Sequence, residues 1–245
     1  MGEQLYDTIG GGYSATRQTD PQIAAILWGQ LGGADRVLNV GAGAGSYERT
    51  DRRVVAVEPS VTMRAQRPAG AAPCVAGVAE ALPFPDGSFD VAMSVLSDWY
   101  WPDRRRGFAE MRRVARERVL LLTIDRSVAE RFWLSAEYLP RAHDLWGAFS
   151  ETLSQFSPCD VLDVPVPADC ADGFFHAFWR RPHAYLQDSV RRTMAVFNNL
   201  ESAEALAGVT RLADDLASGA WHARHEDLLE LETLDLGYRL LVGDV

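Results

Sequence analysis

The stretch VLNVGAGAGSYERTDRRVVAVEPS, residues 37–60, holds the strongest pattern in the chain. It contains two mostly apolar runs, residues 37–40, which follow Arg36, and residues 54–57. Short apolar runs that end at glycine or polar text predict buried strands. Three glycines follow the first run directly, and glycine lets a backbone turn tightly and come close to a bound ligand. The pattern therefore predicts a strand, a ligand-binding loop and a second strand, with the loop glycines at Gly41, Gly43 and Gly45.

Glu58 ends the second predicted strand. A carboxylate there can accept hydrogen bonds from both ribose hydroxyls of an adenosine, in dinucleotides as well as in S-adenosylmethionine. A dinucleotide fingerprint reads G-x-G-x-x-G. Here the third glycine comes one position early and Ser46 takes its place. The connecting text, SYERTDRR, leaves room for about two helical turns, which is short for a dinucleotide crossover helix.

Further apolar runs predict the rest of a sheet. They lie at residues 72–76, 89–95, 118–124 and 161–166, and the chain closes with a run at 236–244. Residues 21–31 have helical spacing, and so does the arginine-rich text at 104–117. Strands separated by short helices predict a parallel sheet covered on both faces. The expected fold class is α/β: a Rossmann-like, doubly wound, mostly parallel seven-stranded sheet with an aromatic-rich helical cover after strand five.

We find no repeat and no linker, and expect a single domain over residues 1–245. Its expected parts are an N-terminal helical lid (1–34), a cofactor-binding core (35–125), a substrate cover with helices (126–235) and a final strand (236–245).

Three ordered motifs resemble the class I S-adenosylmethionine-dependent methyltransferases, in their small-molecule "type 11" branch. VLNVGAGAG resembles the family's first motif, VEPS its ribose-binding strand end, and GVAEALPFPDGSFD its third-motif region. This resemblance covers about residues 35–125. The segments YDTIGGGYSATR, DGFFHAFWRRP and DLGYRLLV are similar to elements of a bacterial subgroup.

The resemblance implies S-adenosyl-L-methionine as cofactor and S-adenosyl-L-homocysteine as product. It implies that the glycine loop passes the methionine part, that Glu58 holds the ribose, and that Tyr13 and Arg17 cover the methionyl carboxylate. The implied cofactor-binding set is Tyr13, Arg17, Asn39, Gly41, Ala42, Gly43, Gly45, Glu58, Pro59, Ser60, Met63, Val78, Ala79, Glu80, Val95 and Leu96.

The chain departs from the family pattern at three places. Asn39 stands where members usually carry Asp, and Val78 stands where many carry an Asp that meets the adenine. Two histidines that often follow the fourth strand are replaced by LSDWYW, residues 96–101. These departures leave open a protein of this fold that binds the cofactor without methylating, as a scaffold or a cyclase.

The chemistry needs no particular catalytic residue, because the cofactor carries the reactivity and the protein orients the reactants. A base is required only if the acceptor must lose a proton. The candidates are His143 and His176 in the cover and Asp98 after the fourth strand. Each histidine can equally be structural. His222 and His225 lack a third ligand, so no metal site is expected.

Composition narrows the function classes further. The formal net charge is −10, which disfavours sequence-independent nucleic-acid binding. All 24 basic residues are arginines, which excludes a Schiff-base or P-loop lysine. No apolar run could span a membrane, and the N-terminus has no signal-peptide pattern. Three widely spaced cysteines suggest reduced thiols in the cytoplasm.

Aromatic residues are concentrated between positions 131 and 185, where the cover over the ligand edge is expected. We therefore expect methyl transfer to a small, aromatic or apolar metabolite, with the O-, N- or C-acceptor and the oligomeric state left open. A dinucleotide-dependent oxidoreductase is the less favoured alternative.

Overall fold

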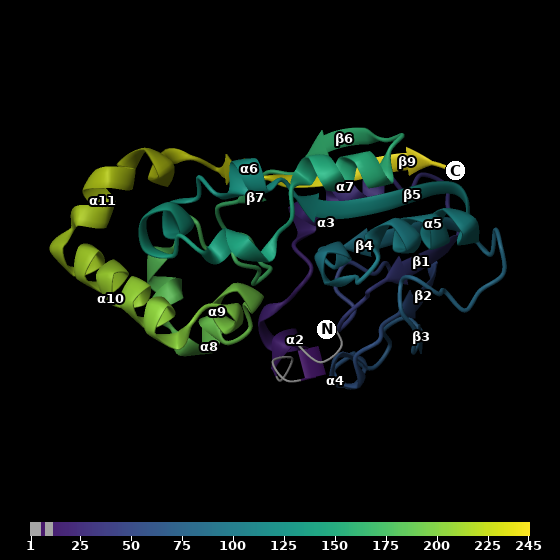
Figure 1. The fold of residues 1–245 in the computed structure, drawn as a ribbon, viewed down its shortest axis with the longest axis horizontal. Coiled ribbons are helices and arrows are strands. Elements are labelled where there is room, and N and C mark those ends of the chain that lie inside the picture. The colour runs from purple at the N-terminus through teal and green to yellow at the C-terminus, as the bar shows by residue number, and fades with distance from the viewer. Residues whose placement is uncertain (1–5, 8–11) are drawn as a thin grey trace.

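The computed structural model describes residues 6–7 and 12–245 of the chain, and Figure 1 shows its fold. Seven strands form one sheet in the order β3-β2-β1-β4-β5-β9-β6. Strands β1 to β5 pair in parallel, whereas β9 is antiparallel to both β5 and β6. The expected doubly wound, mostly parallel fold is thus confirmed. The strands are β1 Arg36–Val40, β2 Arg53–Val57, β3 Cys74–Val75, β4 Phe89–Val95, β5 Ala115–Ile124, β6 Asp160–Asp163 and β9 Tyr238–Asp244.

Both faces of the sheet are covered, because successive side chains of a strand point to opposite faces. Val37 packs in one core cluster with Ile23 of α3 (Pro21–Gly29), and the adjacent Leu38 packs in a second cluster with Phe108 of α5 (Arg104–Val114). Helix α7 (Phe149–Phe156) joins the second cluster beside α5. In Figure 1, α5 and α7 lie in front of the sheet and α3 lies behind it.

Helix α3 starts where the sequence predicts, after Asp20. The Asp20 carboxylate accepts hydrogen bonds from the backbone N–H groups of Gln22 and Ile23, at 2.9 and 3.0 Å. Pro21 occupies the first helical position, where its missing N–H costs no helical hydrogen bond.

The helical cover stands at one side of the sheet, on the left in Figure 1. Its core contains the buried side chains of Trp133, Trp179 and Trp221. Among the residues that the structure describes, no helix has the length and apolar composition that crossing a bilayer requires. The remaining cover elements are α6 Arg126–Ala129, a π-helical turn η2 Leu134–Tyr138, η3 Ala142–Leu145, η4 Pro182–Leu186, α8 Asp188–Arg191, α9 Ala195–Asn199, α10 Ser202–Ser218, α11 Ala220–His225, η5 Glu226–Glu230, and a small sheet of β7 Val166–Pro167 with β8 Thr233–Leu234.

Two local expectations are wrong. The text after the glycine loop forms turns rather than a helix, because Tyr47 adopts a φ of 64°, outside the helical region. The run at residues 161–166 divides between β6 in the large sheet and β7 in the small one. Pro165 lies between them and has no N–H with which to continue a ladder.

Candidate cofactor site

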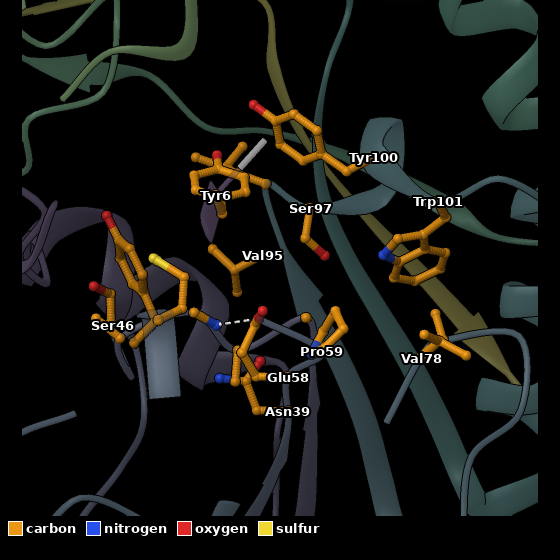
Figure 2. A pocket seen from close by; sticks show the side chains of 18 of the residues that line it. Tyr6, Asn39, Ser46, Glu58, Pro59, Val78, Val95, Ser97, Tyr100 and Trp101 are labelled. Atoms are coloured by element: carbon orange, nitrogen blue, oxygen red, sulfur yellow. Dashed lines mark hydrogen bonds between the residues drawn. The ribbon is translucent and has the colours of Figure 1, made fainter. Parts of the chain in front are cut away.

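A cavity of about 400 Å³ lies at the carboxyl ends of β1, β2 and β4. The chain leaves β1 and β4 toward opposite edges of the sheet, and such a switch point is where doubly wound sheets bind ligands. Figure 2 shows the cavity with residues from all three strand ends around it. Its lining consists of Tyr6, Tyr13, Arg17, Asn39, Gly41, Ala42, Gly43, Ala44, Ser46, Tyr47, Glu58, Pro59, Met63, Val78, Ala79, Glu80, Val95, Leu96, Ser97, Tyr100, Trp101, Pro102, Asp103 and Arg106.

The glycine loop passes too close to its neighbours for a larger side chain. Gly41 has a φ of 68°, and a Cβ on it would lie 2.4 Å from the Ser97 hydroxyl oxygen. The Gly41 N–H donates to the Val57 carbonyl oxygen at 2.9 Å, which holds the loop over β2. The backbone therefore forms one wall of the cavity.

Glu58 lies at the middle of the cavity floor in Figure 2. Its two carboxylate oxygens accept hydrogen bonds from the Gly43 and Ser60 N–H groups, at 2.8 and 2.9 Å. The side chain is largely buried, and this burial raises the pKa of the carboxyl group above its usual value of 4.5. A carboxylate oxygen can accept more than one hydrogen bond, so Glu58 can still receive two hydroxyl groups of a ligand.

Asn39 lies on β1 below the loop. Its Nδ2 donates to Glu48 Oε1 at 3.1 Å, whereas its buried Oδ1 has no hydrogen-bond partner among the described residues. Because a buried polar atom without a partner is costly, Asn39 Oδ1 marks a place for a ligand donor.

Arg17 follows the short helix α2 (Tyr13–Thr16) and brings a cation to the lining of the cavity. Its Nε donates to Asp172 Oδ1 at 2.7 Å, and its Nη1 donates to the Tyr13 hydroxyl group. Burial is the largest single influence on the pKa of Arg17 and lowers it, but the charge and hydrogen bond of Asp172, together with Tyr13 and Tyr6, hold that pKa well above its usual value. The guanidinium is therefore a permanent cation in the lining of the cavity that also contains the unpaired Asn39 Oδ1.

Another part of the cavity lining contains the aromatic side chain of Trp101 and the aliphatic side chain of Val78, with the charged residues Glu80, Asp103 and Arg106 next to them in the chain. Trp101 follows the 3-10 turn η1 (Asp98–Tyr100) and packs against α5, where a Cβ on Gly107 would lie 2.5 Å from the indole. Figure 2 places Trp101 and Val78 together, away from Ser46. Their aromatic and aliphatic surfaces suit an apolar, planar group.

Comparisons with known proteins agree with this geometry. Residues 38–123 match the family described as "Methyltransferase domain". A solved structure of a candidate methyltransferase from an antibiotic biosynthesis pathway of Anabaena variabilis is 28% identical, with a TM-score of 0.86 over 94% of this chain and 99% of that one. The resemblance to the class I S-adenosylmethionine-dependent methyltransferases, in their type 11 branch, is therefore confirmed over residues 38–123.

Two less similar structures share the fold. The [4+2]-cyclase SpnF is 14% identical, with a TM-score of 0.56 over 99% of this chain and 94% of that one. A geranyl diphosphate C-methyltransferase from Streptomyces coelicolor is 16% identical, with a TM-score of 0.51 over 90% of this chain and 77% of that one. No curated protein matches the sequence.

The larger cavity gathers the sequence-predicted set, except for Gly45 and Ser60. Both residues contact the lining from outside the cavity. Gly45 lies in the glycine loop with a φ of 98°, and the Ser60 N–H donates a hydrogen bond to Glu58. The N-terminal segment was expected to contribute from Tyr6 onward, but residues 8–11 lie outside the described part of the chain. Sequence reasoning missed Ser97, Tyr100 and Trp101, although LSDWYW directly follows the fourth strand.

None of the three candidate bases lines this cavity. The buried Asp98 carboxylate accepts from Thr123 Oγ1 at 2.9 Å and from Arg104 at 2.8 Å, and burial raises its pKa. His176 is fully buried with Nδ1 2.9 Å from the Tyr238 hydroxyl group, and burial lowers its pKa to about 3. Burial also lowers the pKa of His143. Asp98, His143 and His176 are therefore buried in the packed interior and do not face this cavity.

A second cavity of about 50 Å³ adjoins the first. The two share Tyr6, Tyr13, Arg17, Leu96 and Tyr100, and the Tyr6 ring contacts those of Tyr13 and Tyr100 with centroids 5.5 and 5.0 Å apart. The rest of its lining comes mainly from the helical cover: Trp99, Ile124, Trp146, Phe174, Phe175, Thr193, Met194, Ala195, Val196 and Tyr238. Of the described residues that line it, none is acidic.

Proposed function

We propose that the chain binds S-adenosyl-L-methionine in the larger cavity and transfers its methyl group to a small aromatic or apolar metabolite in the smaller one. One observation carries this proposal: side chains suited to three different parts of the cofactor line a single cavity. Arg17 and Asn39 Oδ1 suit a zwitterionic amino acid, Glu58 suits a ribose, and Trp101 suits a planar base.

The cofactor fits the residues present. Arg17 would hold the carboxylate, Asn39 Oδ1 would accept from the ammonium, and Glu58 would accept from both ribose hydroxyls. When bound, S-adenosylmethionine supplies an electrophilic methyl group on its sulfonium. The protein's own part is to orient the two reactants and to exclude water.

The acceptor site follows from the position of the second cavity. It adjoins the first through the shared residues Tyr6, Tyr13, Arg17, Leu96 and Tyr100, which include the arginine that suits the amino acid, and Trp101 does not line it. A methyl acceptor must approach from such a place, because the sulfonium lies between the amino acid and the ribose. The aromatic and aliphatic lining, in which Arg17 is already ion-paired with Asp172, favours an uncharged apolar or aromatic body.

The proposed transfer uses positioning rather than a protein base. His143, His176 and Asp98 line neither cavity, and a His176 pKa of about 3 makes that imidazole a poor proton acceptor near neutral pH. An acceptor atom that carries a free lone pair before reaction, such as a neutral amine nitrogen, suits this arrangement.

Turnover tests this proposal. The purified chain is incubated with S-adenosylmethionine and a panel of small aromatic and apolar amines, phenols and thiols, and S-adenosylhomocysteine is measured. We expect product with at least one acceptor. Ala195→Phe should fill the second cavity and lower turnover by ~10–10²-fold without weakening S-adenosylhomocysteine binding, because misplaced reactants lose that much.

Ala207→Phe is the matched control, since Ala207 is an exposed alanine on α10. We expect it to keep wild-type turnover. If the chain binds the cofactor but forms no S-adenosylhomocysteine with any acceptor, the non-methylating scaffold or cyclase replaces this proposal.

A further inference from the structure

Three segments of the chain meet on the carboxylate of Asp172. Its side chain is fully buried and lines neither cavity. Oδ1 accepts from Arg17 Nε at 2.7 Å and from the Gln18 N–H at 3.2 Å. Oδ2 accepts from the Tyr47 hydroxyl group at 2.9 Å. One carboxylate thus joins the N-terminal segment, the glycine loop and the helical cover.

The first consequence is a fixed orientation for Arg17. A guanidinium has five N–H donors. Nε and Nη2 donate to Asp172, at 2.7 and 3.4 Å, and Nη1 donates to the Tyr13 hydroxyl group. One N–H on each Nη remains, and together they can meet a ligand carboxylate. Without Asp172, the buried side chain would lose both its charge partner and its orientation.

The second consequence concerns the glycine loop. Tyr47 closes the loop in a left-handed conformation, with a φ of 64°. Its N–H donates to Thr19 Oγ1 at 2.7 Å and its hydroxyl group donates to Asp172. Next to Asp172, Gly173 lies so close to the N-terminal segment that a Cβ would be 2.6 Å from the Thr16 carbonyl oxygen. The loop and Arg17 therefore have a common anchor.

We propose that Asp172 is a positioning residue for the amino-acid end of the cofactor, holding Arg17 and the glycine loop in register with each other. This inference rests on the proposed function. It assigns to Asp172 no contact with the adenosine part, which Glu58 and Trp101 would hold.

The test compares two ligands that differ only in the amino-acid end. S-adenosylhomocysteine has that end, and 5′-methylthioadenosine lacks it. We expect Asp172→Asn in the full chain to raise the Kd of S-adenosylhomocysteine about tenfold or more, with tenfold corresponding to ~1.4 kcal/mol. The Kd of 5′-methylthioadenosine, measured by the same calorimetry, should change by less than about twofold, which corresponds to ~0.4 kcal/mol.

Asp20→Asn is the matched control. Asp20 is a buried aspartate that joins the same two segments, because it caps α3 and its Oδ2 accepts from the Ala171 N–H at 2.9 Å. Its hydrogen bonds go to the Gln22, Ile23 and Ala171 N–H groups and not to Arg17, so its loss should leave the ratio of the two affinities unchanged. Tyr47→Phe removes one donor to Asp172 with little change in volume, and should shift that ratio in the same direction as Asp172→Asn. This second variant keeps the test decisive if Asp172→Asn does not fold.

A double-mutant cycle separates positioning from general destabilisation. If Asp172 acts through Arg17, then Asp172→Asn should weaken S-adenosylhomocysteine binding much less in an Arg17→Gln background. Equal weakening of both ligands by Asp172→Asn, or of neither, would overturn the inference. A wild-type chain that binds neither ligand would instead overturn the proposed function on which it rests.

Discussion

At the scale of a single residue, Glu58 is the side chain that best shows how the site is prepared for a ligand. Its side chain is largely buried, and both carboxylate oxygens are already oriented by backbone N–H groups of Gly43 and Ser60. Burial disfavours the charged form and raises the pKa, while the backbone donors oppose that rise. The carboxylate is therefore oriented before any ligand arrives, but its ionisation depends on pH.

This ionisation leads to a prediction for cofactor affinity. Ribose hydroxyls donate to the carboxylate, so binding favours the ionised form. In the free protein the pKa of Glu58 lies above 4.5, and the ionised fraction is lost as the pH falls through that raised value. We expect the Kd of S-adenosylhomocysteine, measured by calorimetry at successive pH values, to be constant on the alkaline side and to increase as the pH falls toward 4.5.

Glu58→Gln is the control, because it cannot titrate. Its weaker affinity should be flat over the same pH range. A wild-type affinity that is equally flat would remove Glu58 from the ribose contact.

Backbone strain also falls at the site. Among the described residues, Tyr47 and Leu96 are the non-glycine residues with positive φ, at 64° and 52°. Such a conformation costs roughly 1–2 kcal/mol per residue. Tyr47 lines the larger cavity and Leu96 lines both cavities. Strain kept at ligand-facing positions is typical of sites where geometry is fixed for function.

Residues differ in how far the sequence can predict them. Glu58 is predictable, because it directly follows an apolar run and a glycine loop. Asp172 is not, because its partners Arg17 and Tyr47 are 155 and 125 positions away in the chain. Only folding brings these side chains together.

At the scale of elements, α2 is the most weakly held part of the site. The four-residue helix buries none of its side chains. Its attachments are polar: the Arg17 ion pair with Asp172, and a 2.8 Å hydrogen bond between the Thr16 and Thr193 hydroxyl groups. A segment with few buried apolar contacts has a low local stability, so it should open more readily than the sheet.

We therefore expect cofactor binding to protect this segment. Hydrogen exchange of the backbone amides at residues 13–17 should slow when S-adenosylhomocysteine is added, because the ligand carboxylate would bridge to Arg17. Exchange in α3 is the internal control, since its inner face belongs to the core and lines neither cavity. Unchanged exchange at residues 13–17 in saturating ligand would contradict a cover that closes over the cofactor.

The sequence predicted strands correctly where a whole run of residues is buried. It failed where the backbone conformation of a single residue overrides the hydrophobic pattern. The runs that became β1, β2, β4 and β5 are apolar because both faces of the sheet are covered. The turns at residues 46–52 depend on the left-handed Tyr47, and the division near residue 165 depends on one proline. Neither effect changes the average hydrophobicity of its stretch.

At the scale of the whole molecule, the two ends of the chain close one site. The N-terminal segment brings Tyr13 and Arg17 to the sheet edge, and the cover after β5 brings Asp172 and the aromatic lining of the second cavity. The family motifs lie between these two parts, within residues 38–123. The lining of the larger cavity is therefore largely predictable from sequence, whereas that of the smaller cavity is not.

The aromatic residues of the cover show why the lining of the smaller cavity could not be predicted. Its rings are alike in sequence, but Trp146, Phe174 and Phe175 line the second cavity, whereas Trp133 and Trp179 do not line it and are buried in the core. Helical packing over many turns decides which rings face a ligand. The sequence pattern alone predicts an aromatic region and not its inner surface.

Calorimetric titration of the wild-type chain with S-adenosylmethionine, and separately with NAD⁺, tests the central claim most directly. We predict one binding site for S-adenosylmethionine and none for NAD⁺. Glu58→Ala should weaken S-adenosylmethionine binding by about 2–3 kcal/mol, the range for hydrogen bonds to a charged group, and the exposed Glu130→Ala should leave it unchanged. Binding of NAD⁺ that depends on Glu58, or S-adenosylmethionine affinity that is the same with and without Glu58, would contradict the account.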